Sequence, residues 1–271
     1  MKIRVLGSGT SQGVPVVGCT CPVCLSADSR DKRSRCSLYI KGKDGEQAVI
    51  DTGPEFRLQA LQAGISSLDA VLLTHAHADH IHGLDDIRPL SKETAIPIYG
   101  NKKTLREFKE RFSYIFKRTQ QGGGKPRIKP VLAAGPFRIG GLCFVPIPVK
   151  HGVLDILGWM GFEYHRKNET KFVYITDCTR IGRDSLSRIT EGGPPELCII
   201  GALRVRPHKT HFNFEEALSA AAETGARRIF LTHICHEHSH REIESYCAGF
   251  AEAGKITAKT GPAWDGMELD L

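Results

Sequence analysis

One short stretch of the chain concentrates side chains that bind metal ions. Directly after the apolar run 70–73, six residues contain four such groups: His75, His77, Asp79 and His80. If the strand continues through the first two histidines, both imidazoles point the same way, whereas the last two residues fall where a turn or helix begins. The cluster can therefore supply ligands to two neighbouring metal ions. The alternative, a polar loop that merely carries these residues, leaves their place after a buried-type strand unexplained.

Three more candidate ligands stand just past apolar runs of strand length. They are His151 after residues 143–149, Asp177 after residues 171–176 and His233 after residues 228–232. A single histidine at a strand end is as often a structural group as a ligand. Together with the first cluster, however, these residues make five histidines and two aspartates at sheet edges, where active sites commonly gather.

Cysteines form a second cluster. Cys19, Cys21 and Cys24 have a spacing typical of a thiolate knuckle around tetrahedral zinc. His236 is the candidate fourth ligand, because it lies three residues beyond His233 and the turn between them can direct the two imidazoles to different sites. Such a closed site is structural and ties the N-terminal loop to this strand end. The alternative is a metal-free thiol cluster, or a disulfide in an oxidised preparation.

The order His-x-His-x-Asp-His, then His151, Asp177 and His233, resembles the metallo-β-lactamase-fold hydrolases over nearly the whole chain. Three further motifs are similar to the branch that contains the PhnP-type phosphoribosyl cyclic phosphodiesterases. These are GSGTSQGVP at 7–15, GLDDIRP at 83–89, and Ala-Leu-Arg at 202–204 with His211-Phe212. The resemblance implies an α/β (α+β) four-layer αββα sandwich, with a dinuclear site in the cleft between the sheets.

The resemblance also implies a division of the ligands. One metal would be held by His75, His77 and His151, the other by Asp79, His80 and His233, and Asp177 would bridge them. It supports the extra zinc in the knuckle and a catalytic histidine at position 211. Mixed imidazole and carboxylate ligation suits Zn²⁺, Mn²⁺ or Fe²⁺. The resemblance favours Mn²⁺ in the active site and Zn²⁺ in the knuckle, with zinc in both left open.

The chain departs from the expected pattern at Gly201, which precedes Ala-Leu-Arg where close relatives are expected to have an aspartate. This departure weakens the prediction that neighbouring residues orient the nearby metal ligands, but it does not change the predicted ligands themselves.

Two divalent ions about 3.5–4 Å apart can activate a bridging hydroxide and polarise a bound phosphate ester. Asp79 is expected to orient that hydroxide as well as to bind metal. His211 is the expected general acid for the leaving alkoxide, because histidine titrates near neutral pH, and His208 is the fallback. A structural role stays open for both histidines. The leading function is a phosphodiesterase for a small cyclic or linear ester, such as a cyclic ribose phosphate or a nucleoside cyclic phosphate.

Two other classes of function stay open. An RNA-processing nuclease of the tRNase Z kind would share the metal ligands, but the chain lacks a long inserted arm with which such enzymes grip tRNA. A thioester or lactone hydrolase, or a binding protein without turnover, is the third class. His211 and a cationic segment both favour phosphate over a neutral acyl substrate.

Positive charge is concentrated in residues 102–129. This segment has ten basic and two acidic residues, whereas the whole chain of 271 residues has a net charge of only +7. With Gly122-Gly123-Gly124 inside it, the segment can form a flap that attracts phosphate, or contact a nucleic-acid backbone. The ordinary alternative is a solvated helix face and loop.

Composition is typical of a cytoplasmic enzyme with one domain, 1–271. A hydrophobic content of 41% suffices for a large core. Nine cysteines are an odd number, which argues against a fully paired secreted framework. The first residues do not resemble a signal peptide, and no apolar run approaches the ~20 residues of a membrane span. Relatives make a homodimer an expectation.

Short strands and helices should alternate along the chain. The pattern predicts helices at 55–63, 101–111 (with Asn101 as N-cap), 214–224 and 241–253. It predicts strands at 36–40, 47–51, 71–74, 127–132, 137–139, 142–149, 159–164, 171–176 and 197–200.

Overall fold

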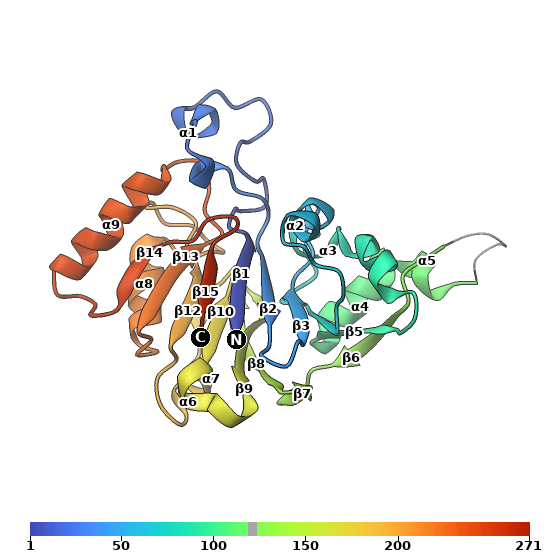
Figure 1. Cartoon of the computed structure of the whole chain (residues 1–271). Coiled ribbons are helices and arrows are strands. Elements are labelled where there is room, and N and C mark those ends of the chain that lie inside the picture. The colour runs from blue at the N-terminus through green and yellow to red at the C-terminus, as the bar shows by residue number, and fades with distance from the viewer. Residues whose placement is uncertain (119–123) are drawn as a thin grey trace.

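The computed structural model describes residues 1–118 and 124–271, so most of the expected glycine flap, Gly122-Gly123-Gly124, lies outside the described residues. Within these ranges the strands form two mixed sheets of seven and eight strands (Figure 1). The first has the order β15-β1-β2-β3-β4-β5-β6. The second has the order β11-β8-β9-β10-β12-β13-β14, with β7 paired to β8.

The strands of the first sheet are β1 (Lys2–Gly7), β2 (Ser37–Lys41), β3 (Gln47–Ile50), β4 (Ala70–Leu72), β5 (Ile96–Gly100), β6 (Ile128–Leu132) and β15 (Glu268–Asp270). Those of the second are β7 (Phe137–Ile139), β8 (Leu142–His151), β9 (Leu154–Glu163), β10 (Phe172–Ile175), β11 (Arg180–Ile181), β12 (Leu197–Gly201), β13 (Arg228–Thr232) and β14 (Lys259–Pro262). The helices are α1 (Pro22–Leu25), α2 (Phe56–Gln62), α3 (Ala78–Ile81), α4 (Lys102–Arg111), α5 (Ser113–Phe116), α6 (Lys167–Thr170), α7 (Arg183–Thr190), α8 (Phe214–Ala222) and α9 (His240–Glu252).

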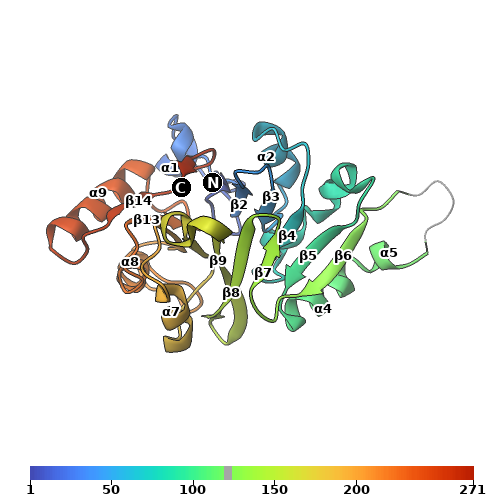
Figure 2. The same ribbon diagram turned by 60° about the horizontal axis from the view of Figure 1, so that its bottom comes forward.

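Alternate side chains along a strand point into two different hydrophobic cores, one on each face of the sheet. In β10, Phe172 and Tyr174 lie in the core between the two sheets, whereas Val173 and Ile175 lie in the core under α7, α8 and α9. This is the two-residue period of a strand buried on both faces. The outer face of the first sheet is covered by α2, α3, α4 and α5 through a third core (Figure 2). The expected four-layer αββα sandwich is confirmed.

Parallel pairing determines where the loops meet. β3, β4, β5 and β6 are parallel to one another, as are β10, β12, β13 and β14. Their carboxyl ends therefore open at one edge of each sheet. The candidate ligands of 75–80, Asp177 and His233 come after β4, β10 and β13, whereas His151 ends the antiparallel strand β8.

The elements differ in detail from the sequence prediction. β4 ends at Leu72, so His75 and His77 lie in a loop and not on a continuing strand. β9 begins at Leu154, five residues before the predicted strand, because it forms a long antiparallel hairpin with β8. The predicted N-cap at Asn101 is confirmed, since its side chain accepts a hydrogen bond from the backbone N–H of Thr104 at 2.8 Å. Among the described residues, no helix is both long and apolar enough to cross a membrane.

Candidate metal centre and active site

Three strand ends of the site share an uncommon backbone conformation. Asp51 after β3, Asp177 after β10 and His233 after β13 have φ angles of 60°, 51° and 58°. Residues other than glycine seldom adopt this left-handed region, and such residues are concentrated at functional sites. The sharp reversal places each side chain at the mouth of the sheet directly after its strand.

The loop after β4 and the short helix α3 bring the remaining residues of the first cluster to the same place. Close backbone packing holds α3 in position: a Cβ atom added at Gly53 would lie 2.4 Å from the carbonyl oxygen of Asp79. Only glycine permits this approach.

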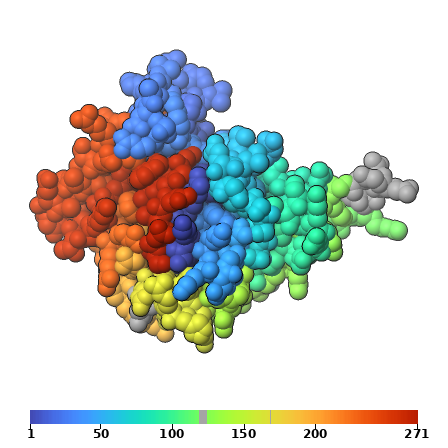
Figure 3. Space-filling view, in the orientation of Figure 1, coloured from blue at the N-terminus to red at the C-terminus, as the bar shows by residue number. Residues whose placement is uncertain are grey.

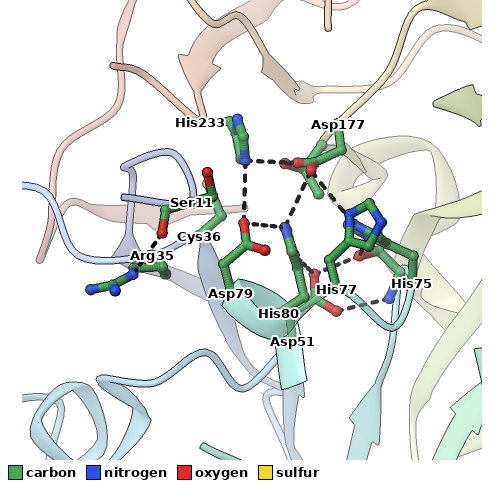
Figure 4. Close-up of polar contacts among 12 residues, drawn as sticks. Ser11, Arg35, Cys36, Asp51, His75, His77, Asp79, His80, Asp177 and His233 are labelled. Carbon is green, nitrogen blue, oxygen red and sulfur yellow. Dashed lines mark hydrogen bonds and ion pairs between the residues drawn. The ribbon is translucent and has the colours of Figure 1, made fainter. Parts of the chain in front are cut away.

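The seven candidate ligands form two groups that share one residue. Figure 4 labels six of them, all except His151. The first group is His75, His77, His151 and Asp177; the second is Asp79, His80, Asp177 and His233. In each group one ligand atom from every residue lies within 4.8 Å of the others. Asp177 is therefore placed between the two groups.

The carboxylate of Asp177 faces both groups, with Oδ2 near one histidine of each group and Oδ1 near a second histidine of the second group. Its Oδ2 lies 3.5 Å from Nε2 of His75 and 3.4 Å from Nε2 of His80, and its Oδ1 lies 3.0 Å from Nε2 of His233. Ligand atoms about 2.1 Å from one cation are separated by roughly 3.0–3.4 Å in octahedral or tetrahedral geometry. These separations match that spacing.

Several buried nitrogen atoms of the cluster have no hydrogen-bond partner among the residues that the structure describes. They are Nε2 of His80 and both ring nitrogens of His233. A buried polar atom without a partner is costly, and a bound cation removes that cost. The donor set of imidazoles and carboxylates is therefore of the type that binds divalent metal ions.

Asp51 orients the cluster and was missed by the sequence analysis. Its fully buried carboxylate accepts hydrogen bonds from Nδ1 of His80 at 2.7 Å, and from the backbone N–H and the hydroxyl of Thr74 at 2.8 and 2.7 Å. Because the Thr74 hydroxyl donates to Asp51, it accepts from Nδ1 of His75 at 3.0 Å. Both imidazoles are thus turned so that Nε2 faces the cluster.

His151 is oriented in the same manner. Its Nδ1–H donates to the carbonyl oxygen of Thr210 at 2.7 Å, which leaves Nε2 free as an acceptor. Thr210 lies beside His211, so this bond joins the end of β8 to the loop that carries the predicted general acid.

Electrostatics indicate that the cluster requires positive charge. Burial alone would raise the pKa of Asp177, but His233 and His80 outweigh it and hold that pKa well below its usual range. Burial acts to lower the pKa of His233, but the carboxylate of Asp177 outweighs it and raises that pKa to about 10. Protons on the histidines thus balance the buried carboxylates, in the place that a metal cation would take.

His211 lies against both groups. Its ring centroid is 4.9 Å from that of His151 and 4.8 Å from that of His233. Burial, followed by the charge of His233, lowers the pKa of His211 to about 3. The imidazole is therefore neutral at pH 7 before substrate binds, in contrast to the expected group titrating near neutrality. His208 is exposed, with its ring 5.1 Å from that of His211, and is farther from the cluster.

The three cysteines of the predicted knuckle converge on His236. The distances from its Nδ1 to the sulfur atoms of Cys19, Cys21 and Cys24 are 3.3, 3.5 and 3.5 Å. A tetrahedral zinc with ordinary Zn–S and Zn–N bonds separates sulfur and nitrogen by about 3.6 Å, so the four residues fit this ion. The segment with α1 protrudes from the body of the protein (Figure 3).

The thiols do not all ionise without a cation. A hydrogen bond from the backbone of Cys24 lowers the pKa of Cys21 to about 6, whereas burial raises the pKa of Cys24 to about 11. In the described residues all nine cysteines are unpaired. Binding of zinc would therefore displace protons from the knuckle.

The basic segment 102–129 is partly engaged in the site. Arg111 at the end of α4 donates a hydrogen bond to the carbonyl oxygen of Ala76, between two candidate ligands. Lys103 and Glu107 line a small cavity that also contains His75 and His77. These three residues of α4 therefore lie against the loop that carries His75 and His77, in addition to any role of the segment in attracting anions.

Gly201 lies beside Asp177. A Cβ atom at this position would lie 3.0 Å from the backbone nitrogen of Asp177 and 3.2 Å from Cα of Thr176. An aspartate at this position, as expected in close relatives, would crowd the turn that carries Asp177. Glycine at position 201 therefore allows the backbone to pack more closely against that turn.

Comparison with known proteins agrees with this geometry. A family model described as a beta-lactamase superfamily domain matches residues 47–234. A solved structure of a diphosphatase from the PhnP family is similar with a TM-score of 0.84 and 35% identity, covering 100% of this chain and 97% of that one. Zn²⁺-bound PqqB from Methylobacterium extorquens has a TM-score of 0.78 at 20% identity, covering 100% of both chains, and shows the fold alone.

One curated relative is much longer. The octanoyltransferase of Porphyromonas gingivalis is 38% identical over 250 residues, which cover 90% of this chain and 48% of that protein. The chain thus spans about half the length of this relative. A coenzyme PQQ synthesis protein B of Methylobacterium radiotolerans is 30% identical over 118 residues, 39% of this chain and 38% of that protein.

Fold and clusters together define a metal-dependent hydrolase of the metallo-β-lactamase type. The chain belongs to the β-lactamase superfamily and, within it, resembles a diphosphatase of the PhnP family.

Proposed function

We propose that this protein hydrolyses a small phosphodiester, cyclic or linear, such as a cyclic ribose phosphate or a nucleoside cyclic phosphate. The observation that carries the proposal is the pair of ligand groups joined at Asp177 with His211 stacked beside them. Similarity to a diphosphatase of the PhnP family supports phosphate as the reacting group.

In this proposal His75, His77 and His151 would hold one divalent cation, Asp79, His80 and His233 would hold the other, and Asp177 would be a ligand of both. When bound, the two cations would supply an activated water and Lewis acidity toward the phosphoryl oxygens. The active-site cations would be Mn²⁺ or Zn²⁺, and the knuckle of Cys19, Cys21, Cys24 and His236 would hold Zn²⁺.

The chain's own residues would orient and protonate the reacting groups. Asp79 lies with Oδ2 3.2 Å from Nε2 of His80 and 3.7 Å from Nε2 of His233, where it can accept a hydrogen bond from the attacking water and orient it. His211 is neutral before substrate binds, and it must take up a proton on its second ring nitrogen before it can donate one to the leaving oxygen. The negative charge of a bound phosphodiester favours the protonated imidazole, which strengthens this role.

A second candidate is acyl chemistry, hydrolysis of a thioester or lactone. The relative named octanoyltransferase favours it. Because only 48% of that protein matches, its named activity can belong to the part that has no counterpart here. The fold is also shared with human short-form tRNase Z, at a TM-score of 0.65 and 16% identity, which bears on the fold only.

The test is a panel of substrates at equal concentration after loading with Mn²⁺ or Zn²⁺. Bis-p-nitrophenyl phosphate and a 2′,3′-cyclic nucleotide should be hydrolysed, and a thioester and a tRNA precursor should not. Turnover of the thioester alone would overturn the proposal.

We also propose a single domain, a homodimer and a cytoplasmic location. The unpaired cysteines in the described parts of the chain support a reducing compartment.

A further inference from the structure

The loop that carries His211 has no regular secondary structure of its own. It runs from the end of β12 to the start of α8, and its residues 205–209 are exposed. The base of the loop is closed by the backbone N–H of Leu203, which donates to the carbonyl oxygen of Phe212 at 2.9 Å. The exposed part depends on side-chain contacts for a fixed position, because an exposed loop without such contacts is mobile.

Two arginines at the start of this loop converge on one carboxylate, that of Glu237. Nη1 of Arg204 donates to its Oε1 at 2.8 Å, and Arg206 donates from Nε to Oε2 at 3.0 Å and from Nη2 to Oε1 at 2.7 Å. The pairing of Arg206 is bidentate, which fixes its geometry as well as its charge. Among the described residues, Glu237 is the only hydrogen-bond acceptor of the Arg204 guanidinium, whose buried Nε has no partner. The carboxylate therefore holds this part of the loop.

Glu237 lies in a turn that contributes to both metal clusters. It directly follows His236 of the knuckle, and it lies four residues after His233 of the active site. The backbone of this turn is joined to the N-terminal loop, because the N–H of Ile234 donates to the carbonyl oxygen of Ser8 at 3.0 Å. The arginines of the His211 loop are thus bound to a segment that is itself held in place.

The same turn and loop meet a second time at the active site. His233 belongs to the turn and His211 to the loop, and their rings stack with centroids 4.8 Å apart and an angle of 17° between their planes. The place of His211 relative to the metal ligands therefore depends on how the loop lies on the turn. A displacement of about 1 Å in a reacting group is enough to lower the rate of a reaction strongly.

We propose that Glu237 is a positioning residue for His211, and that it acts by holding the loop through Arg204 and Arg206. The inference rests on the proposed function, in which His211 protonates the leaving oxygen. Glu237 contacts no candidate metal ligand of the active site, so its effect on the reaction passes through the loop alone.

The kinetic test compares a poor and a good leaving group. Glu237→Gln keeps the size of the side chain but removes its charge and one acceptor oxygen. With adenosine 2′,3′-cyclic phosphate, whose leaving group is an alkoxide, kcat should fall roughly 3- to 10-fold, since the charged pairs are partly exposed. With bis-p-nitrophenyl phosphate kcat should fall much less, because p-nitrophenolate leaves without a proton.

Glu196→Gln is the matched control. Glu196 pairs with Arg227 and Arg228 at 3.4 and 3.2 Å, and its side chain is 23% exposed, against 27% for Glu237. It precedes β12, at the end of the strand opposite to the His211 loop. The control variant should therefore leave both rates unchanged.

A double-mutant cycle separates positioning from a general structural effect. If Glu237 acts through His211, Glu237→Gln should cause no further loss of kcat in the His211→Ala background. Additive losses, equal losses with the two leaving groups, or no loss with the cyclic nucleotide would overturn the proposal. A kinetic loss that is accompanied by loss of zinc from the knuckle would assign the effect to the knuckle and would overturn it as well.

Hydrogen exchange tests the contact without turnover. The backbone amides of Leu203 and Phe212, at the base of the loop, should exchange faster in Glu237→Gln than in the wild type and in Glu196→Gln. Unchanged exchange would overturn the proposal whatever the enzyme hydrolyses. A wild type that hydrolyses no phosphodiester would refute the proposed function, and faster exchange in the variant would then still show that Glu237 holds the loop.

Discussion

Replacing Asp51 by asparagine should weaken metal binding without unfolding the protein. The carboxylate accepts three hydrogen bonds, two of them on Oδ2 from His80 and Thr74. An amide has one acceptor oxygen, so in either orientation at least one donor loses its partner. A hydrogen bond to a charged group contributes about 1.5–3 kcal/mol, which corresponds to roughly a 10- to 100-fold loss of affinity.

The assay is a competition titration of Mn²⁺ or Zn²⁺ against a chromophoric chelator, with thermal melting at saturating metal as the folding check. Asp69→Asn is the matched control, because Asp69 precedes β4 at the opposite end of the same pair of strands and accepts from the backbone N–H of Gln47. It should leave metal affinity unchanged. The reasoning about Asp51 is refuted if Asp51→Asn binds both metals as tightly as the wild type.

Three further outcomes are expected. His211→Ala should retain the metal content and lose ~10²–10⁴-fold in kcat with an alkyl leaving group, but much less with p-nitrophenol; equal losses would exclude proton donation. The buried ammonium group of Lys171 donates hydrogen bonds to three carbonyl oxygens around the end of α7. Lys171→Met should therefore lower the free energy of unfolding by ~2–3 kcal/mol in urea titrations. An unchanged free energy of unfolding would contradict this stabilising role. Burial, and then the charge of Arg33, lowers the pKa of His240, so below about pH 6.5 the unfolded chain binds more protons than the folded one and the free energy of unfolding should decrease as the pH is lowered. His240→Gln should make the free energy of unfolding less dependent on pH in this range. Superimposable plots of unfolding free energy against pH for the wild type and the variant would exclude His240 as the cause.

The candidate ligands could be located from the sequence by two signals. The first is the motif at 75–80, and the second is a polar residue at the end of a buried strand, a condition that His151, Asp177 and His233 each meet. Asp51 meets it as well, after the apolar run that ends at Ile50. It was missed because it belongs to no metal-binding motif, although the same rule applied to every strand would have found it.

Other features depend on contacts that a local pattern does not contain. β15 pairs with β1 at the opposite end of the chain, and its three residues carry no strong strand signal. The lowered pKa of His211 depends on burial against His233, which only the folded chain creates.

The most direct test of the central claim is a crystal structure of the metal-loaded protein with anomalous diffraction recorded at the Mn and Zn edges. Two peaks about 3.5–4 Å apart are expected on either side of Asp177, and a third is expected at the sulfur atoms of the knuckle. A single peak in the cluster of a protein loaded with excess metal, or metal bound away from Asp177, would contradict it.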